Sequence, residues 1–416
     1  METVTAAGDL AIGATSLLDQ ILREGARQML QHAIEREVAD YIEAHAHEVD
    51  EQGHRLVVRN GRLPARKLAT PAGPIRIEQP RVDDRRRDAS GNRLFCFSSA
   101  ILPKYLRKSK SIEELVPWLY LKGISSSDFP EALCALGLDG SGLSAASVIR
   151  MKELWRGEWL DWSRRSLAGK RYVYFWADGI HFNIRLEEPG SKRACVLVLM
   201  GATEDGTKEL IAISEGHRES EMSWRELLLD LKQRGLECGP QLATGDGALG
   251  FWKALEQAYP QTRHQRCWVH KTANVLNALP QNRQESAKHM LQQIWMAATR
   301  AEAHAAFDAF VASYQPKYPK AALCLSKDRD ELLAFYDFPA EHWSHLRTTN
   351  PIESTFATVR LRTAKTKGAG TRAACLTMTF KLVQCAQRRW NRLKGSALLR
   401  EVIDGIPFID GIRHAA

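Results

Sequence analysis

The sequence lacks the features of a membrane protein or of a small disulfide-bonded secreted domain. Its longest apolar run, roughly residues 194–202, is far shorter than the ~20 residues of a membrane-spanning helix. The first residues, Met-Glu-Thr-Val, contain neither a basic segment nor the apolar segment of a secretory signal. No two of the 8 cysteines have Cys-x-x-Cys spacing, and a chain of 416 residues does not need disulfides to fold. We therefore expect reduced thiols and a cytoplasmic location.

Internal repeats and low-complexity segments are also missing. Hydrophobic residues make up 44% of the chain and charged residues 26%, which is ordinary for a soluble globular protein. A chain of 416 residues has room for about two to four domains and a sizeable core.

The positive charge of the chain is concentrated in two segments. The formal net charge is +9, yet residues 358–394 contain ten Lys or Arg and no acidic residue. Residues 59–87 contain nine basic and three acidic residues. Concentrated positive charge suits a phosphate backbone, so we expect a polyanionic partner. For one basic run alone, a solvated helix face explains the charge equally well.

The N-terminal part changes character along its length. Apolar residues recur at helical spacing over about residues 14–47, which predicts a long amphipathic helix whose apolar stripe is core or a dimer seam. Residues 66–70 and 75–79 are expected to pair as a hairpin across Gly73, followed by a charged linker over residues 83–92.

A second helical region is predicted next. Ser111 and Ser144 begin helices that reach about Lys122 and Arg164, and a third helix begins at Ser127-Asp128. Short helices separated by Gly-containing turns are typical of helix-turn-helix DNA binding, and a plain helical bundle accounts for the pattern equally well.

From Arg171 the pattern becomes that of a mixed α/β core. We expect strands over residues 172–176, 181–186 and 194–200, then a helix, a strand at residues 242–244, a helix, and a short strand over residues 265–269. After His270 the pattern is helical to about residue 345, and Asn350-Pro351 begins one more helix.

Three acidic residues in this region are candidate catalytic residues. Asp178 and Asp246 each follow an apolar segment and precede a glycine, and Glu353 lies in the helix that begins at Asn350. Acidic residues at strand ends of an open α/β sheet lie where sites form. Phosphodiester chemistry needs an activated nucleophile and neutralised negative charge, which two divalent ions roughly 4 Å apart supply. Carboxylates are ligands that Mg²⁺ and Mn²⁺ prefer.

Each of these acids also has an ordinary structural explanation. Asp-Gly after a strand is common in turns, and a carboxylate in a first helical turn interacts favourably with the helix dipole. The three acids together, with the order of elements around them, favour a metal site. The helix of Glu353 also continues into the segment of ten cations, so the expected metal site and the densest basic charge are neighbours.

Four motifs resemble those of the Mutator-type bacterial insertion-sequence transposases, and the resemblance runs from about Ala14 to Ala397. The last two motifs are specific, whereas the first two would be weak alone. The matching stretches are Trp176-Ala-Asp-Gly179, Gly245-Asp-Gly247, Arg266-Cys-Trp-Val-His270 and Arg347-Thr-Thr-Asn-Pro-Ile-Glu-Ser354.

The resemblance implies an α/β fold: a ribonuclease H-like mixed sheet with helices, interrupted by an all-helical insertion and preceded by a mostly helical DNA-binding region. By motif match, its DDE triad of catalytic metal ligands falls on Asp178, Asp246 and Glu353. The expected parts are an amphipathic helix, a basic hairpin and linker, a helical DNA-binding region, the first part of the core, the insertion and the second part of the core. Their boundaries are 1–50, 51–92, 93–168, 169–270, 271–346 and 347–416.

The resemblance also suggests supporting residues. The family's Cys-x-x-His motif falls on Cys267 and His270, and Asn350 precedes Glu353 by three residues. A Cys and a His three apart can begin a zinc site, but no second pair matches, and a buried cysteine with a hydrogen-bonding histidine is favoured. Glu219 and Glu221 are candidate extra ligands, which charges at a helix N-terminus explain more simply.

We therefore predict a DDE-type transposase that binds the terminal inverted repeats of its insertion sequence and catalyses metal-dependent DNA cleavage and strand transfer. Two Mg²⁺ (or Mn²⁺) ions, a homodimer or higher oligomer on paired DNA ends, target DNA and a nucleoid-associated bacterial location are expected from the resemblance. The alternatives are a catalytically silent DNA-binding protein derived from a transposase and a nuclease that only hydrolyses. The residues expected to hold the DNA backbone are Arg360, Arg362, Lys365, Lys367 and Arg372.

Overall fold

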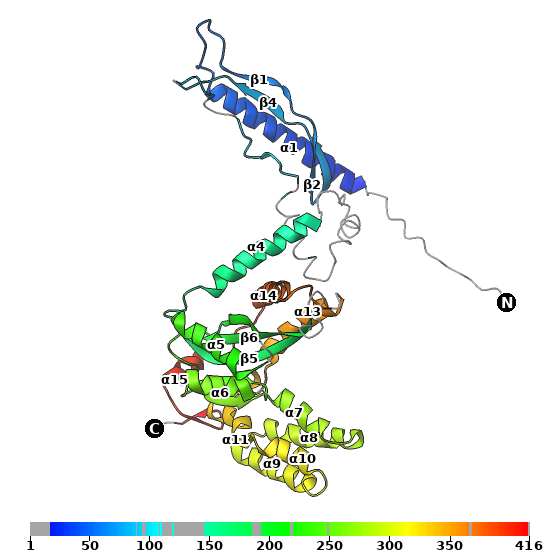
Figure 1. Cartoon of the computed structure of the whole chain (residues 1–416), viewed down its shortest axis with the longest axis vertical. Coiled ribbons are helices and arrows are strands. Elements are labelled where there is room, and N and C mark those ends of the chain that lie inside the picture. Colours follow the sequence, from blue (N-terminus) through cyan, green and yellow to red (C-terminus); the bar gives the residue numbers. More distant parts are fainter. Residues whose placement is uncertain are drawn as a thin grey trace, which may run out of the picture. The chain divides into compact units, whose positions relative to one another are not determined.

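A computed structural model of the chain divides into two compact units, Met1–Met151 and Lys152–Ala416 (Figure 1). No helix among the described residues is long and apolar enough to cross a membrane. The structure describes residues 17–88, 90–93, 97–107, 109, 119, 145–184, 193–216, 219–247, 249–365 and 368–414.

The first unit is a helix packed on two small antiparallel sheets. Strand β1 pairs with β4, and β2 pairs with β3 in a hairpin whose turn joins Thr70 to Gly73. Ile34 of the helix packs with Leu68, Ile75 and other apolar residues of the strands, so one small core holds this unit together. The elements are α1 (Leu17–Ala44), β1 (Val57–Arg62), β2 (Arg66–Thr70), β3 (Gly73–Ile77) and β4 (Pro80–Asp84).

The hairpin across Gly73 and the N-terminal helix are confirmed, with two differences. Strands β1 and β4 were not predicted, because polar and charged residues dominate them and only their pairing defines them as strands. The apolar stripe of α1 divides: Val38 is buried, whereas Leu18 and Ile21 are 63% and 60% exposed.

The mostly helical N-terminal region is not established, since residues 57–84 form four strands. Apart from residue 119, the helices expected around residues 111–122 and 127–136 lie outside the described residues. Helix α4 (Ala145–Ser163) matches the helix that Ser144 was expected to begin.

The second unit contains a five-stranded mixed sheet in the order β7-β6-β5-β8-β9, which confirms the mixed α/β class. Strands β5, β6 and β7 are antiparallel neighbours, whereas β8 runs parallel to β5 and β9 runs parallel to β8. The strands are β5 (Tyr172–Asn183), β6 (Arg193–Thr203), β7 (Lys208–Gly216), β8 (Leu242–Gly245) and β9 (Arg263–Arg266).

The prediction of separate strands at residues 172–176 and 181–186 is wrong, because β5 is continuous across Asp178 and Gly179. These two residues pair with Val198 and Leu197 of β6, so the Asp-Gly dipeptide lies within a ladder and not in a turn. The third antiparallel strand is β7, whose short apolar centre between charged ends was not recognised.

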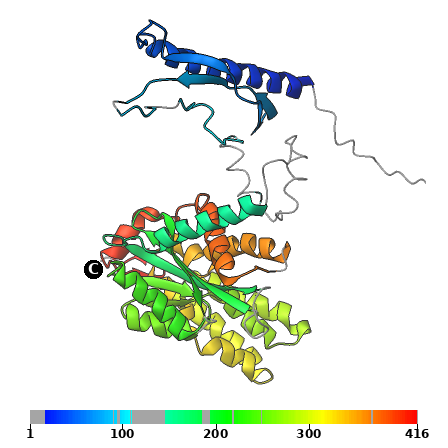
Figure 2. The ribbon, with the colours of Figure 1, turned by 45° about the horizontal axis from the view of Figure 1, so that its top comes forward.

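Side chains alternate across the sheet and build two different layers. Phe175 and Ala177 belong to a core with α5 (Glu221–Gln233) and α6 (Leu249–Ala258). Tyr174 and Trp176 point to the other face, where the Tyr174 hydroxyl lies 2.8 Å from His342 Nδ1 and Trp176 Nε1 donates to the His345 carbonyl at 2.8 Å. The sheet lies between the two sets of helices (Figure 2).

Between β9 and Asn350 the described elements are all helical, as expected for residues 271–346. Trp268 anchors this segment, because its buried Nε1 donates to the Leu332 carbonyl at 2.8 Å. The elements are α7 (Trp268–Asn277), α8 (Gln281–Met296), α9 (Arg300–Tyr314), α10 (Pro319–Ser326), α11 (Arg329–Leu332), η2 (Ala334–Asp337), η3 (Ala340–His342) and α12 (Trp343–Leu346).

The C-terminal part returns to the sheet. Helix α13 contacts β5 and helix α14 contacts β7, so both complete the layer opposite α5 and α6. The elements are α13 (Asn350–Lys365), α14 (Arg372–Gln387), η4 (Ser396–Leu398), α15 (Leu399–Ile403), β10 (Phe408–Ile409) and β11 (Ile412–Arg413).

Candidate active site

Asp178 of β5 and Asp246, the residue that follows β8, occupy matching positions along two neighbouring parallel strands. Ala177 of β5 pairs with Gly245 of β8, and each aspartate is the next residue along its chain. Parallel neighbours lie about 4.8 Å apart, so this register brings the two aspartates close together. Strand β8 ends there while β5 continues, which places the pair where the edge of β5 becomes free of β8.

Helix α13 adds the third carboxylate. Glu353 lies in the first turn of α13, where the Thr349 hydroxyl donates to Glu353 Oε1 at 2.8 Å. His270 Nδ1 of helix α7 lies 3.7 Å from the same carboxylate oxygen. Thr349 is fully buried, so the start of the helix and the Glu353 side chain are held from inside the protein.

His270 is the common neighbour of the three acids. Its pKa is raised to about 9, first by a hydrogen bond to the Cys267 sulfur and further by the charges of Asp246 and Asp178, with burial opposing. Because His270 also lies beside Glu353, acids from β5, from the end of β8 and from α13 converge around one imidazole. Near neutral pH this imidazole is a cation among carboxylates.

Asp178 is a buried carboxyl group. It is 5% exposed, and burial raises its pKa to about 7. The charges of Glu219 and Asp246 raise the pKa further, whereas His270 and a hydrogen bond from the Gly179 amide lower it. A carboxylate in this environment gains from any cation that reaches it.

A fourth acid, Glu219, belongs to the same group. Burial raises its pKa to about 7, the charge of Asp246 raises it further, and His270 lowers it. The side chain lies over Gly179, since a Cβ on that glycine would come within 2.6 Å of Glu219 Oε1. Glu221 lies in the first turn of α5, so the explanation by helix-terminal charge suits it, but this explanation does not account for the position of Glu219.

Arg266, the first residue of the Arg266–His270 motif, holds the backbone of the site. Arg266 lies over the ring of Trp252, and its Nη1 donates to the Asp246 carbonyl at 3.0 Å. Trp252 Nε1 donates to the same carbonyl at 2.8 Å, so two side chains fix the backbone of Asp246.

Cys267 is buried and accepts a hydrogen bond from the amide of Thr349 at 3.3 Å, and the Thr349 hydroxyl oxygen lies 3.3 Å from the same sulfur. Ligand atoms of Cys267, His270 and Glu353 lie within 4.8 Å of one another, so Glu353 joins the Cys-x-x-His pair. The described cysteines Cys195, Cys238, Cys267, Cys324, Cys375 and Cys385 are all free thiols, as expected for them.

The five basic residues expected to hold DNA occupy different environments. Arg360 is exposed, Arg362 is 3% exposed, and Arg372 lies 2.6 Å from Glu215. The side chains of Lys365 and Lys367 lie outside the described part of the structure.

Asn350 is exposed at the start of α13. Together with Trp295 and Arg347 it lines a cavity of about 360 Å³ beside α7 and α8.

Comparison with known proteins agrees with these motifs. The model of the Mutator family of transposases matches residues 3–392. The transposase for insertion sequence element IST2 of Acidithiobacillus ferrooxidans is 52% identical over 284 residues, covering 67% of this chain and 93% of the relative. The transposase for insertion sequence element IS6120 of Mycolicibacterium smegmatis is 49% identical over 300 residues, covering 72% of this chain and 92% of the relative.

More distant relatives carry the same description. The transposase for insertion sequence element IS256 in transposon Tn4001 of Staphylococcus aureus is 28% identical over 353 residues, covering 83% of this chain and 85% of the relative. Because the family model spans nearly the whole chain, the protein belongs to the Mutator family of transposases.

Proposed function

We propose that this protein cleaves DNA at the ends of an insertion sequence and joins the freed 3′ ends to target DNA, using Asp178, Asp246 and Glu353. The observation that carries this proposal is the register of β5 with β8, which places Asp178 beside Asp246 at the end of β8, with Glu353 lying near the same histidine. Membership of the transposase family supplies the reaction class.

The donor set fits divalent magnesium or manganese. Carboxylate oxygens are the ligands that these hard cations prefer, and the buried Asp178 gains from a cation. Asp178, Asp246 and Glu353 would hold the ions, with Glu219 beside them. When bound, a pair of such ions activates the attacking oxygen and neutralises charge on the phosphate.

The chain's own residues prepare the site. Thr349 orients Glu353, and Arg266 with Trp252 fixes the backbone on which Asp246 stands. His270 supplies a positive charge to the carboxylates in the absence of DNA and metal. Groups that are held in place before the substrate arrives do not have to be ordered during the reaction.

The sheet supports a ribonuclease H-like core. Three antiparallel strands continue into two parallel ones in the order β7-β6-β5-β8-β9, with helices on both faces. The helical segment between β9 and α13 separates Asp246 from Glu353 in sequence, and α13 returns to β5. This arrangement corresponds to a core interrupted by a helical insertion.

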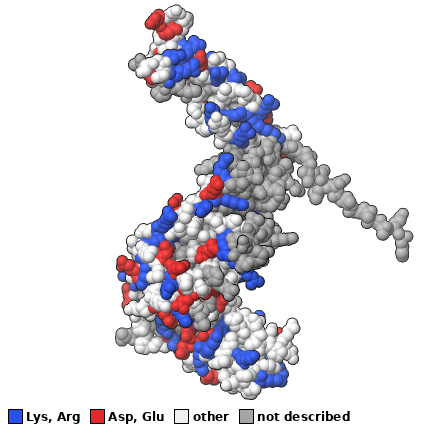
Figure 3. Space-filling model, viewed as in Figure 1, with Lys and Arg blue, Asp and Glu red and all other residues white. Residues whose placement is uncertain are grey.

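DNA binding would use exposed cations of both units. In the first unit, Lys and Arg side chains are spread over the visible surface (Figure 3). Arg360 is an exposed cation on the helix of Glu353. The exposed basic residues of the first unit include Arg59, Lys67, Arg76, Arg81, Arg85 and Arg87.

We further propose that the protein acts as an oligomer on paired DNA ends. Helix α1 exposes Leu18, Ile21, Leu22 and Met29, which are 63%, 60%, 53% and 76% exposed. Apolar side chains repeated along one exposed helix favour contact with a second apolar helix.

A cleavage assay tests the proposal. Purified protein is incubated with a labelled element end and Mg²⁺, and nicking and strand-transfer products are followed. We expect Asp246→Asn to lose cleavage while still binding DNA, and the exposed Asp404→Asn to cleave like wild type. Equal cleavage by Asp246→Asn and wild type would contradict the assigned role. DNA binding without cleavage by the wild type under any divalent metal would favour the silent DNA-binding alternative.

A further inference from the structure

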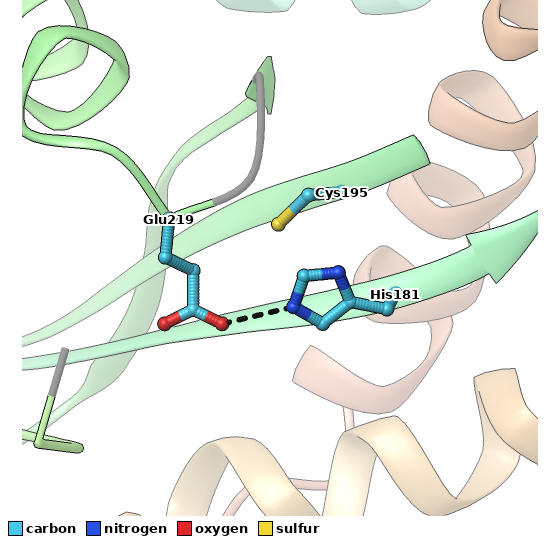
Figure 4. Close-up of side chains that lie close together, drawn as sticks. All are labelled: His181, Cys195 and Glu219. Carbon is cyan, nitrogen blue, oxygen red and sulfur yellow. Dashed lines mark hydrogen bonds and ion pairs between the residues drawn. The ribbon is translucent and has the colours of Figure 1, made fainter. Parts of the chain in front are cut away.

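A second group of potential metal ligands lies beside the carboxylates. Side chains of His181, Cys195 and Glu219 point toward one another from three separate segments (Figure 4). One ligand atom of each lies within 4.8 Å of the other two. The group differs from the carboxylate set because it combines an imidazole, a thiol and a carboxylate.

The sheet itself creates this group. His181 of β5 is paired directly with Cys195 of β6, so both side chains lie on the same face. Gly179, two residues before His181, is on that face too, and its missing Cβ leaves room for Glu219. Glu219 Oε1 then lies 3.2 Å from His181 Nε2.

The three potential ligands differ in their exposure to solvent. The His181 side chain is 55% exposed and that of Glu219 is 18% exposed, whereas Cys195 is 2% exposed. An ion can therefore enter from solvent past the histidine, while the sulfur at the inner end is shielded from oxidants. A closed apolar core would offer no such path, and three exposed side chains would not be held together.

The donor types select the ion. Magnesium prefers oxygen ligands, whereas a thiolate and an imidazole select zinc and related transition metals. Three protein ligands with a fourth position for water are a common arrangement around zinc. We propose that His181, Cys195 and Glu219 bind one divalent transition-metal ion of the zinc class, with water as the fourth ligand.

Binding exchanges a proton for the metal. The S–H bond of Cys195 breaks as the sulfur–metal bond forms, and the proton passes to solvent. The Glu219 carboxylate turns from His181 to the ion, so the ion replaces a hydrogen bond that already holds two of the ligands in place. The proposal rests on these contacts alone and does not depend on DNA cleavage.

Cobalt(II) in place of zinc tests the site in the full-length protein without DNA. We expect a thiolate-to-cobalt charge-transfer absorption that saturates at one equivalent and persists in excess Mg²⁺. Cys195→Ser should abolish the band. His181→Ala should weaken cobalt binding at least about tenfold, since losing even an outer partner of a metal site costs ~10–100-fold.

Matched variants separate this site from other thiols. Cys267→Ser and Cys238→Ser should keep the band, and substitution of the exposed His289 of α8, His289→Ala, should leave cobalt binding as in wild type. Circular dichroism and thermal melting establish that each variant is folded. If Cys195→Ser does not fold, His181→Ala tests the proposal, because removing this exposed side chain leaves the core intact.

Any one of three results would overturn the proposal. These are no charge-transfer band in the wild type, a band that survives in Cys195→Ser, and cobalt binding by His181→Ala as tight as by wild type. A band lost in Cys267→Ser and kept in Cys195→Ser would place the metal at the Cys267–His270–Glu353 group instead.

Discussion

At the scale of single residues, the site is governed by burial of negative charge. Asp178 and Glu219 are both buried enough for their pKa values to rise to about 7. The charge of Asp246 raises both pKa values further, and the charge of Glu219 also raises that of Asp178. His270 is the cation that offsets part of this cost. Acids held in this way are poised to accept a divalent cation, which relieves their repulsion.

Gly179→Ala tests whether Glu219 contributes without removing any carboxylate. The new Cβ would approach Oε1, Cδ and Cγ of Glu219 to within 2.6–2.7 Å, so the side chain must leave its position. Displacement of a site group by ~1 Å can cost ~100-fold in rate, and we expect cleavage to fall about 10- to 100-fold.

Gly157→Ala in α4 is the matched control, because a Cβ there meets nothing within 4 Å. Cleavage rates of the two variants are compared on the same labelled DNA end. If Gly179→Ala cleaves as fast as Gly157→Ala, Glu219 plays no part in the reaction.

The sequence identified most of these residues but not the position of Glu219 in the site, and the reason is physical. Asp178, Asp246, Glu353 and His270 stand in recognisable motifs. Glu219 precedes a helix, where a carboxylate has an ordinary explanation, and only the glycine opposite it shows that its side chain lies over the sheet. A missing Cβ on one strand and an acid from another segment are not related by any sequence spacing.

At the scale of elements, contacts at the start of α13 fix the position of the Glu353 side chain. Thr349→Val removes the hydroxyl that donates to Glu353 Oε1 at 2.8 Å while nearly keeping the volume of this buried residue. We expect stability to fall by about 1 kcal/mol and cleavage to fall about tenfold, as for loss of other orienting partners. Thr349→Ser keeps the hydroxyl and should cleave close to wild type. Equal rates for the Val and Ser variants would show that this bond does not orient Glu353.

A second element-scale prediction concerns acid stability of β4. Hydrogen bonding to Arg86 lowers the pKa of the buried Asp84 to about 2 from an ordinary 3.8. The ionised carboxylate therefore stabilises the folded unit above the unfolded pKa, and this contribution is lost as pH falls through the folded value. A shift of this size corresponds to about 2 kcal/mol.

Asp84→Asn should therefore destabilise the first unit by about 2 kcal/mol at neutral pH, with a difference from wild type that shrinks between about pH 4 and pH 2. Hydrogen exchange of β1 and β4 in the full-length protein measures this, with the exposed Glu51→Gln as control. A difference that stays constant across this pH range would contradict the assigned role of Asp84.

Some helices and strands can be predicted from sequence patterns alone. The hairpin at Gly73, helix α4 and helices α5 and α6 follow from turn residues, caps and periodicity. Strand β5 was divided at Asp-Gly, because a dipeptide that favours turns also fits a ladder when β6 pairs with it along its whole length. Such pairing is a tertiary effect that local preference does not contain.

At the scale of the whole molecule, distant parts of the chain build the candidate site. Two strands and a helix separate β5, which contains Asp178, from β8, which Asp246 follows, and Glu353 comes after an entirely helical segment. Periodicity predicted the mixed α/β class and that helical segment, whereas the combination of the three acids rested on the order of elements, the charge pattern and the family resemblance. Their common proximity to His270 follows from strand register and from the return of α13 to β5, which only the folded chain displays.

The most direct measurement is the position of Mn²⁺ in crystals of the protein with a DNA end, located by anomalous scattering. We predict two peaks roughly 4 Å apart, with carboxylate oxygens of Asp178, Asp246 and Glu353 as ligands. Manganese bound only by other residues, with these three side chains turned away from it, would contradict the account.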